Sequence, residues 1–323
     1  MDKSSLSIIF RELFTLYLMG VDNVSLPGLH YSDFSDWLFR TSDVRAQLKN
    51  EQLKFWTENL RDVQPLHLTL ATPTDELLSP ITEIESTIDV RPLKRFHTLI
   101  SEAEATPFCG FFAAYNILLF KCSSQSSFAV GTVVDQRNIA QLANVVGFFA
   151  NILPVKTYID ASQTFPQYLT SFKGDLLKSL ENDDVAYEDI LSHSGDPSPF
   201  GGYFRHMFTF SGLSLDAIEE LELDGIQVRT IIPLPKVGDQ SELSLTVHSS
   251  TGRVVLQFDN HLFSEETARM LLTAYVTLVK NLGRDSSVKI REVSATANEY
   301  DCLGVRLSRV GEGARAKLYT EKA

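Results

Sequence analysis

The stretch from Phe128 to Lys156 constrains the fold of this chain more than any other part of the sequence. Two apolar runs, residues 128–134 and 150–155, bound it, and both are typical of buried strands. Arg137 follows the first run in a polar turn, and Asn151 interrupts the second run. Both side chains are costly in a segment that only packs, because a buried polar group needs a partner. A solvated Arg137 and an Asn151 that caps a loop are the simplest alternatives.

Composition describes a globular chain with a substantial core. The 323 residues suffice for one large domain or two ordinary ones, with 44% hydrophobic and 22% charged residues. The net charge of −12 disfavours binding to nucleic acid and to anionic membranes. No stretch is long and apolar enough to span a bilayer, and residues 108–120, which contain Asn116, are predicted to form a core helix.

The cysteines and the first residues of the sequence indicate the cellular compartment in which the protein is expected. Cys109, Cys122 and Cys302 are too few and too scattered for a disulfide framework or a zinc site. The first residues lack the order of a signal peptide, with a basic region before an apolar one. We therefore expect a cytoplasmic protein.

The order of the predicted elements indicates an α/β sandwich in which a mixed sheet is covered by helices. We expect helices at about residues 4–20, 31–37, 42–60, 92–104, 106–121, 165–181, 185–191 and 264–281. We expect strands at about residues 84–90, 128–134, 150–155, 203–210, 226–234, 243–248 and 254–258. Ser4 or Ser5 is the predicted cap of the first helix.

Common catalytic motifs are absent from the sequence. It contains no P-loop, no G-x-G-x-x-G after a strand, no H-E-x-x-H and no G-x-S-x-G. The seven histidines are dispersed, and no two have the spacing of metal ligands on a helix, so no metal site is expected. A Ser-His-Asp triad stays open, because its members meet in space rather than in sequence.

Several segments, in order, resemble the motifs of the condensation domains of nonribosomal peptide synthetases. Residues 31–37 (YSDFSDW) are similar to Y-x-D-[FY]-[AS]-x-W, and residues 52–56 (QLKFW) to the Q-L-x-Y-W that follows it. Residues 130–137 (VGTVVDQR) are similar to [IV]-G-x-P-x-x-x-R, with Val133 in place of proline. Residues 147–156 (GFFANILPVK) are similar to G-F-F-V-N-T-L-x-x-R, with lysine as the last residue.

The resemblance implies a chloramphenicol-acetyltransferase-like fold, with two lobes that meet at a tunnel. In this family a donor acyl group and an acceptor amine, each bound to a carrier protein, react to form an amide. The implied partners are carrier protein domains and neighbouring synthetase domains, with no nucleic acid and no membrane. The resemblance implies no separate cofactor and no metal, because the substrates arrive on the phosphopantetheine of the carrier proteins.

The signature H-H-x-x-x-D-G of this family maps only in part onto the chain. Asp2 takes the place of the aspartate, Lys3 replaces the glycine, and both histidines would fall before residue 1. The resemblance therefore implies that most of the first lobe and the catalytic histidine are missing, so we expect the chain to be inactive alone. Without the first lobe, Leu13, Trp37 and Trp56 are expected to be partly exposed.

The expected organisation follows from this alignment. Residues 1–64 would be a helical remnant of the first lobe and its crossover, and residues 65–83 a linker. Residues 84–283 would be the second lobe, and residues 284–323 a linker or a disordered tail.

The resemblance also assigns roles to the two polar residues of the central stretch. Arg137 is expected to pair with Asp2 and to hold the histidine loop in shape, while no catalytic residue is expected within the chain. Asn151 is a candidate to line the tunnel, with hydrogen bonds to neighbouring backbone as the equal alternative. Two other functions stay open, a non-catalytic module that docks carrier proteins and an acyltransferase that acts on an alcohol. The second also requires an H-x-x-x-D histidine, which the chain does not show.

Overall fold

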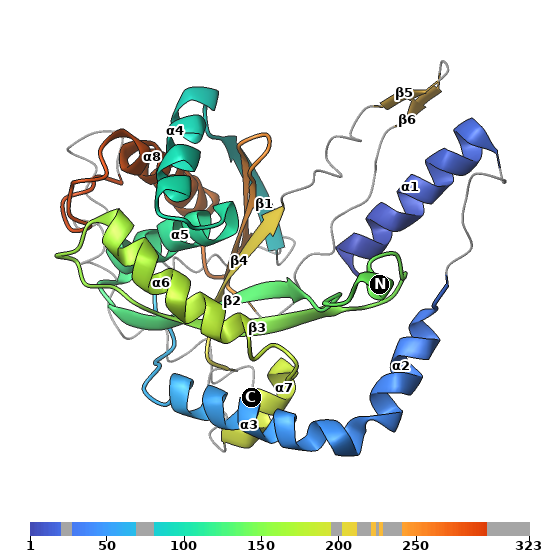
Figure 1. Ribbon diagram of the computed structural model, residues 1–323. Helices are drawn as coiled ribbons and strands as arrows, with labels where there is room; N and C mark the ends of the chain where they lie inside the picture. The colour runs from blue at the N-terminus through green and yellow to red at the C-terminus, as the bar shows by residue number, and fades with distance from the viewer. Residues whose placement is uncertain are drawn as a thin grey trace.

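Figure 1 shows the protein, whose computed structural model describes residues 1–20, 28–68, 81–194, 202–211, 221–223, 226–228 and 241–295. These residues form a mixed sheet of six strands, a separate two-stranded sheet and eight α-helices. A short 3-10 helix, Ala140–Leu142, lies in the loop between β2 and β3.

The six-stranded sheet has the order β1-β8-β7-β4-β2-β3. Its strands are β1 (Ile81–Thr87), β2 (Ser127–Asp135), β3 (Ala150–Tyr158), β4 (His206–Ser211), β7 (Leu243–His248) and β8 (Arg253–Asp259). β4 pairs in parallel with β2 and β7, and the other neighbours are antiparallel. The small sheet pairs β5 (Leu221–Leu223) with β6 (Ile226–Val228).

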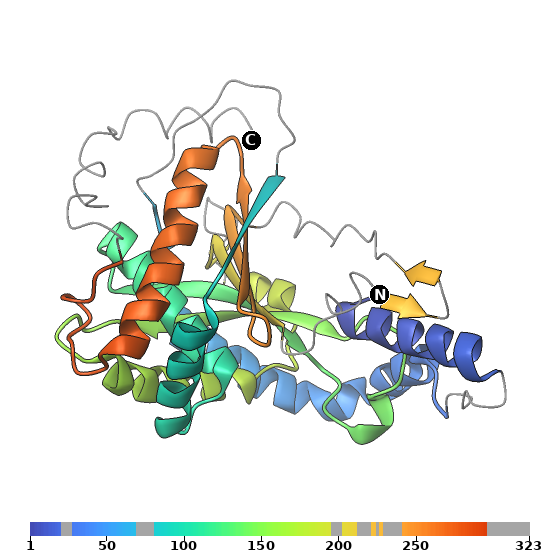
Figure 2. The same ribbon diagram turned by 90° about the horizontal axis from the view of Figure 1, so that it is seen from above.

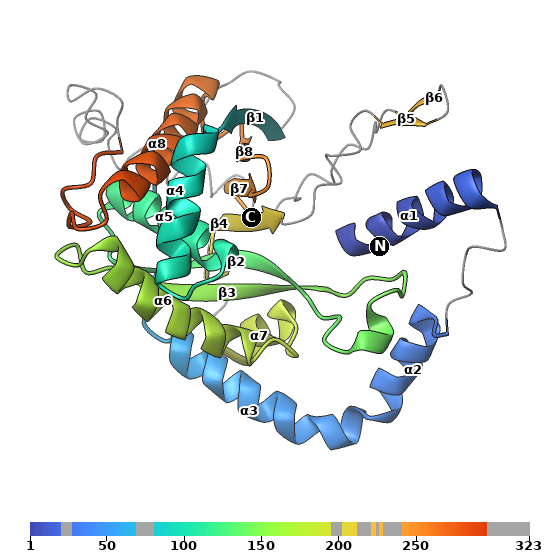
Figure 3. The same ribbon diagram turned by 45° about the horizontal axis from the view of Figure 1, so that its top comes forward.

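The helices lie in two groups. They are α1 (Lys3–Met19), α2 (Tyr31–Arg40), α3 (Ser42–Leu60), α4 (Val90–Glu102), α5 (Pro107–Ser123), α6 (Phe165–Leu180), α7 (Tyr187–Ser194) and α8 (Glu265–Arg284). Figures 1 and 2 show α4, α5, α6 and α8 gathered on one face of the six-stranded sheet. Figure 3 shows α1 and α2 extending from the body at the β2–β3 loop, while α3 packs against α7.

The core lies between the sheet and α5. Thr106 caps this helix by accepting a hydrogen bond from the Cys109 N–H at 3.2 Å, and Pro107 starts it. Twelve residues of α5 are buried, on all sides of the helix. The Phe112 ring stacks on Phe208 of β4 at 4.8 Å between centroids. This burial confirms the core helix that the apolar run predicts, and Cys109 and Cys122 are free, buried thiols within it.

No single helix in the described ranges is long and apolar enough to cross a membrane. Taken together, α4 and α5 are long and apolar enough to cross a membrane, but the two helices are bent by 106° relative to each other. Several of the α4 side chains and most of those of α5 belong to the core, as those of a folded domain do.

Most predicted elements are confirmed within a few residues, and four expectations are wrong. Asp2, rather than Ser4 or Ser5, caps α1. The strand predicted at residues 84–90 begins at Ile81, and Val90 belongs to α4. Trp56 is fully buried and its indole N–H donates to the Asn182 carbonyl at 2.8 Å.

The fourth concerns the predicted tail. Within residues 285–295, Ile290 is fully buried and its N–H donates to the Gln163 carbonyl at 2.8 Å. Lys289 forms a β-bridge with Thr164. These residues therefore pack on the domain, which corrects the prediction of a linker for them. The rest of that tail, most of the predicted linker at 65–83 and most of the strand predicted at 226–234 lie outside the described residues.

Candidate functional site

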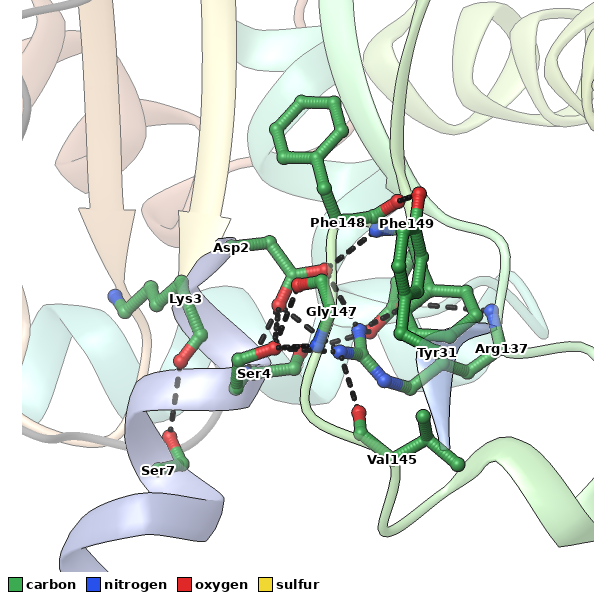
Figure 4. Close-up of polar contacts among 12 residues, drawn as sticks. Asp2, Lys3, Ser4, Ser7, Tyr31, Arg137, Val145, Gly147, Phe148 and Phe149 are labelled. Carbon is green, nitrogen blue, oxygen red and sulfur yellow. Dashed lines mark hydrogen bonds and ion pairs between the residues drawn. The ribbon is translucent and has the colours of Figure 1, made fainter. Parts of the chain in front are cut away.

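Asp2 connects the start of α1 to the β2–β3 loop (Figure 4). Its carboxylate accepts hydrogen bonds from the Ser5 N–H at 2.9 Å and from the Phe149 N–H at 2.8 Å. The first bond caps the helix, and a negative charge at this end is favoured by the helix dipole. The Asp2 N–H in turn donates to the Gly147 carbonyl at 3.2 Å. The start of α1 is thus fixed by both the backbone and the side chain of one residue.

Arg137 binds this carboxylate with both guanidinium nitrogens. Nη1 lies 2.9 Å from Asp2 Oδ2, and Nη2 lies 3.0 Å from Asp2 Oδ1. Both side chains are only 7% exposed. Nη1 also contacts the more exposed Asp135 carboxylate at 2.9 Å, and the guanidinium carbon lies 4.3 Å from the centre of the Phe149 ring. A two-pronged bond of this kind fixes direction as well as distance.

Ser5 completes what we call the Asp2–Arg137 joint, which consists of Asp2, Ser5, Arg137, Gly147 and Phe149. Its hydroxyl donates to the Gly147 carbonyl at 2.7 Å and accepts from the Gly147 N–H at 2.9 Å. It also contacts Asp2 Oδ1 at 2.8 Å and Arg137 Nη2 at 2.9 Å. The sequence predicted Ser5 only as a possible helix cap and missed these contacts, although a residue three positions after an N-cap aspartate commonly donates its N–H to that carboxylate.

The loop is shaped to receive α2 as well. A Cβ added at Gly147 would lie 2.1 Å from the Tyr31 ring, so this close approach requires glycine. The Tyr31 hydroxyl donates to the Phe148 carbonyl at 3.0 Å, and its ring meets the edge of Phe149 at 5.2 Å. Residues from three of the motif-like segments therefore meet at the Asp2–Arg137 joint.

Both charged groups of the pair remain ionised. Burial raises the pKa of Asp2, but hydrogen bonds from Arg137, Phe149 and Ser5 outweigh it and lower the pKa from 3.8 to about 2. Burial tends to lower the pKa of Arg137, but the hydrogen bonds to Asp2 and Asp135 outweigh this effect, so the pKa of Arg137 lies above its usual value. Neither group can exchange a proton near neutral pH, so the pair can position a chain segment but cannot act as an acid or base.

Asn151 lies apart from this pair, at the start of β3. Its amide nitrogen donates to the carbonyls of Asp183 at 2.7 Å and Val185 at 2.9 Å, and its oxygen accepts from the Ile152 N–H at 2.8 Å. These bonds match the alternative of a backbone partner. They tie β3 to the segment between α6 and α7, and the tunnel-lining role of Asn151 stays a prediction.

Among the described residues, no three His, Cys, Asp or Glu side chains are placed to hold a metal ion. Of the residues that the sequence predicted for the site, Asp2 and Arg137 are in direct contact.

Comparison with known families agrees with this geometry. The family model described as "Condensation domain" matches residues 1–301, and the chain belongs to this family. The family forms peptide bonds in nonribosomal peptide synthesis, a branch of secondary metabolism.

Relatives and solved structures resemble the chain over most of its length. Tyrocidine synthase 3 of Brevibacillus parabrevis is 28% identical over 318 residues, which cover 92% of this chain and 5% of that protein. A four-domain nonribosomal peptide synthetase bound to AMP and glycine aligns with a TM-score of 0.79 and 17% identity, over 93% of this chain and 24% of that one. The X-domain in a complex with OxyB from teicoplanin biosynthesis aligns with a TM-score of 0.71 and 18% identity, over 92% and 68%.

These likenesses confirm the predicted fold, an α/β sandwich of the chloramphenicol-acetyltransferase type. They also show that the chain corresponds to a small part of much longer relatives, because it spans only 5% of tyrocidine synthase 3.

Proposed function

We propose that this chain supplies the second lobe of a condensation domain that forms an amide bond between a carrier-bound acyl donor and a carrier-bound amine. Residues 84–283 would be that lobe, and residues 1–64 the last helices of the first lobe with the crossover. Carrier protein domains and neighbouring synthetase domains would be the partners.

The Asp2–Arg137 joint is the observation that carries the proposal. Asp2 stands where the family signature H-H-x-x-x-D-G has its aspartate, and Arg137 stands where the family has its arginine. Because the Asp2 N–H is bonded to Gly147, the backbone before Asp2 starts against the β2–β3 loop. A histidine four residues earlier would be held beside that loop.

The chemistry requires that histidine. Residues 1–323 contain no two adjacent histidines, and the ion pair cannot accept a proton from the attacking amine. We therefore expect residues 1–323 alone to form no amide, and a preceding segment with the H-H-x-x-x sequence to be required.

A condensation assay with donor and acceptor carrier proteins, each charged with an aminoacyl group on phosphopantetheine, tests this proposal. Residues 1–323 are compared with the same residues preceded by a segment that carries H-H-x-x-x. We expect dipeptide from the extended chain only, and less dipeptide when Arg137→Gln is introduced there. A rate above background from residues 1–323 alone would overturn the requirement for the histidine.

A non-catalytic interaction module is the second candidate. The X-domain of teicoplanin biosynthesis has the same fold and is described in a complex with OxyB, so the fold is found bound to another protein. Capture of a charged carrier protein by the extended chain, without any dipeptide, would favour this candidate over the first.

A further inference from the structure

Five exposed cations gather on the outer side of the helical layer. Arg91, Lys94 and Arg95 lie on α4, and Lys280 and Arg284 lie on α8. They line two adjacent shallow hollows, which share Arg91 and Arg95. We call these five residues the α4–α8 basic patch. Such a cluster is unexpected in a chain whose net charge is −12.

Helix geometry and one glycine bring the five side chains together. Arg91 and Arg95 are four residues apart on α4, as are Lys280 and Arg284 on α8, so each pair lies on one side of its helix. A Cβ added at Gly283 would lie 3.1 Å from the Phe96 backbone nitrogen, so glycine lets the two helices approach closely. Figures 1 and 2 show α4 and α8 side by side.

The patch opposes the stability of the helix that carries most of it. α4 begins after Asp89, has no acidic residue in its first turn and places Arg91 there, a position at which the helix dipole disfavours a cation. α8 follows the usual rule, with Glu265 and Glu266 in its first turn and Arg284 in its last. Like charges four residues apart also repel each other. The fold of α4 therefore does not explain its cations.

Among the described residues, these five charges lack a carboxylate at ion-pair distance. Asp285 is next to Arg284 in sequence, but its carboxylate accepts hydrogen bonds from Ser287. At one end of the patch, Val90 is 81% exposed and adds an apolar contact point.

We propose that the α4–α8 basic patch is a docking surface for a carboxylate-rich protein segment. Complementary charge selects such a partner and speeds its association. A protein partner is favoured over a membrane because the matching region makes up only 5% of tyrocidine synthase 3, so most of that relative is further protein chain. The net charge of −12 also repels anionic lipid. This proposal goes beyond amide formation and does not depend on it.

Binding of a fluorescently labelled oligoglutamate peptide, followed by fluorescence anisotropy at low salt, tests the proposal on residues 1–323. We expect Arg91→Glu/Arg95→Glu to weaken binding by about tenfold or more, and added salt to weaken it in the unchanged protein. The matched control is Lys54→Glu/Arg61→Glu, which changes the net charge equally at two exposed cations of the α3 end. The control should change the dissociation constant by less than about twofold.

The variant is expected to fold, because a carboxylate at residue 91 suits the first turn of α4 and both substituted residues are exposed. Arg91→Gln/Arg95→Gln, which removes the charges without reversing them, should also weaken binding, and far-ultraviolet circular dichroism confirms the helix content of each. An equal loss of binding in the control would overturn the proposal. Binding to phosphatidylserine vesicles, with no binding to the peptide, would overturn it in favour of a membrane.

Discussion

Helices α1 and α5 each have 17 residues, but they are held in opposite ways. Twelve residues of α5 are buried, whereas only Ser5 and Ile8 are buried in α1. The far half of α1 exposes large apolar side chains, namely Leu13, Leu16, Tyr17, Leu18 and Met19. α5 is stabilised by apolar burial along its whole length, and α1 chiefly by the Asp2–Arg137 joint at one end.

This difference indicates that the two helices belong to different cooperative units, which unfold separately. A helix with few buried contacts opens locally at a lower free energy than the core does. Loss of a core side chain should therefore destabilise the whole domain, whereas loss of a bond in the joint should destabilise the docking of α1 alone. The following predictions test that separation, from the largest expected effect to the smallest.

Phe112→Ala should lower the free energy of global unfolding by about 3–5 kcal/mol. The Phe112 side chain is fully buried, stacks on Phe208 and meets the edge of Phe172, so its removal leaves a cavity at the centre of the core. Urea unfolding followed by tryptophan fluorescence measures the change. A loss below about 1 kcal/mol would show that α5 does not anchor the domain.

Acid should weaken the sheet through His206, which is fully buried on β4. Burial lowers its pKa from 6.5 to about 4, and Arg205 adds to this while Glu242 opposes it. The folded state then keeps the ring neutral, while the unfolded chain binds a proton below pH 6.5. Stability should be complete above that pH and fall by about 3 kcal/mol as the pH drops to about 4.

The pH dependence of urea unfolding measures this contribution. His206→Leu should remove most of the slope in the same window, and His193→Gln, at an exposed histidine of α7, should leave it unchanged. A slope that persists in His206→Leu would assign the acid sensitivity to another group.

Ser5→Ala should destabilise the docking of α1 by about 1–3 kcal/mol, because it leaves the Gly147 N–H and part of the Arg137 guanidinium without this partner. Hydrogen exchange of the α1 amides measures the loss, and exchange in α5 should not change. Ser7→Ala is the matched control, since the Ser7 side chain is exposed and makes one long hydrogen bond within the helix. Equal effects of the two substitutions would contradict the role of Ser5.

Leu13→Glu should change the free energy of unfolding by less than about 0.5 kcal/mol, because the Leu13 side chain is 53% exposed. It should also reduce self-association, since it interrupts the apolar face of α1. Sedimentation velocity and urea unfolding together test both statements. A large loss of stability would mean that α1 has an apolar partner in the domain.

Local signals in the sequence were sufficient for most of the fold. The apolar residues 108–120 predicted α5, and the strands predicted at residues 243–248 and 254–258 are the paired strands β7 and β8. The packing of residues 285–295 was missed, because Ile290 and Val293 are isolated apolar residues in a polar segment. Their burial depends on backbone bonds to residues 161 and 163, and such long-range contacts leave no local pattern.

The candidate site was predictable only in part. The pairing of Asp2 with Arg137 came from the family resemblance, and their spacing alone does not show it. The roles of Ser5 and Gly147 depend on the approach of α1 to a loop more than a hundred residues later. Trp56 was expected to be partly exposed because most of the first lobe was taken to be missing, yet α3 buries it against the domain itself.

A double-mutant cycle at Asp2 and Arg137 tests the central claim most directly. Asp2→Asn, Arg137→Gln and the double variant are compared with the unchanged protein by hydrogen exchange of the α1 amides. If the bidentate pair holds α1 to the β2–β3 loop, the two substitutions should be coupled by more than about 1 kcal/mol, with exchange in α5 unchanged. Additive effects of the two substitutions, with no coupling, would contradict the account.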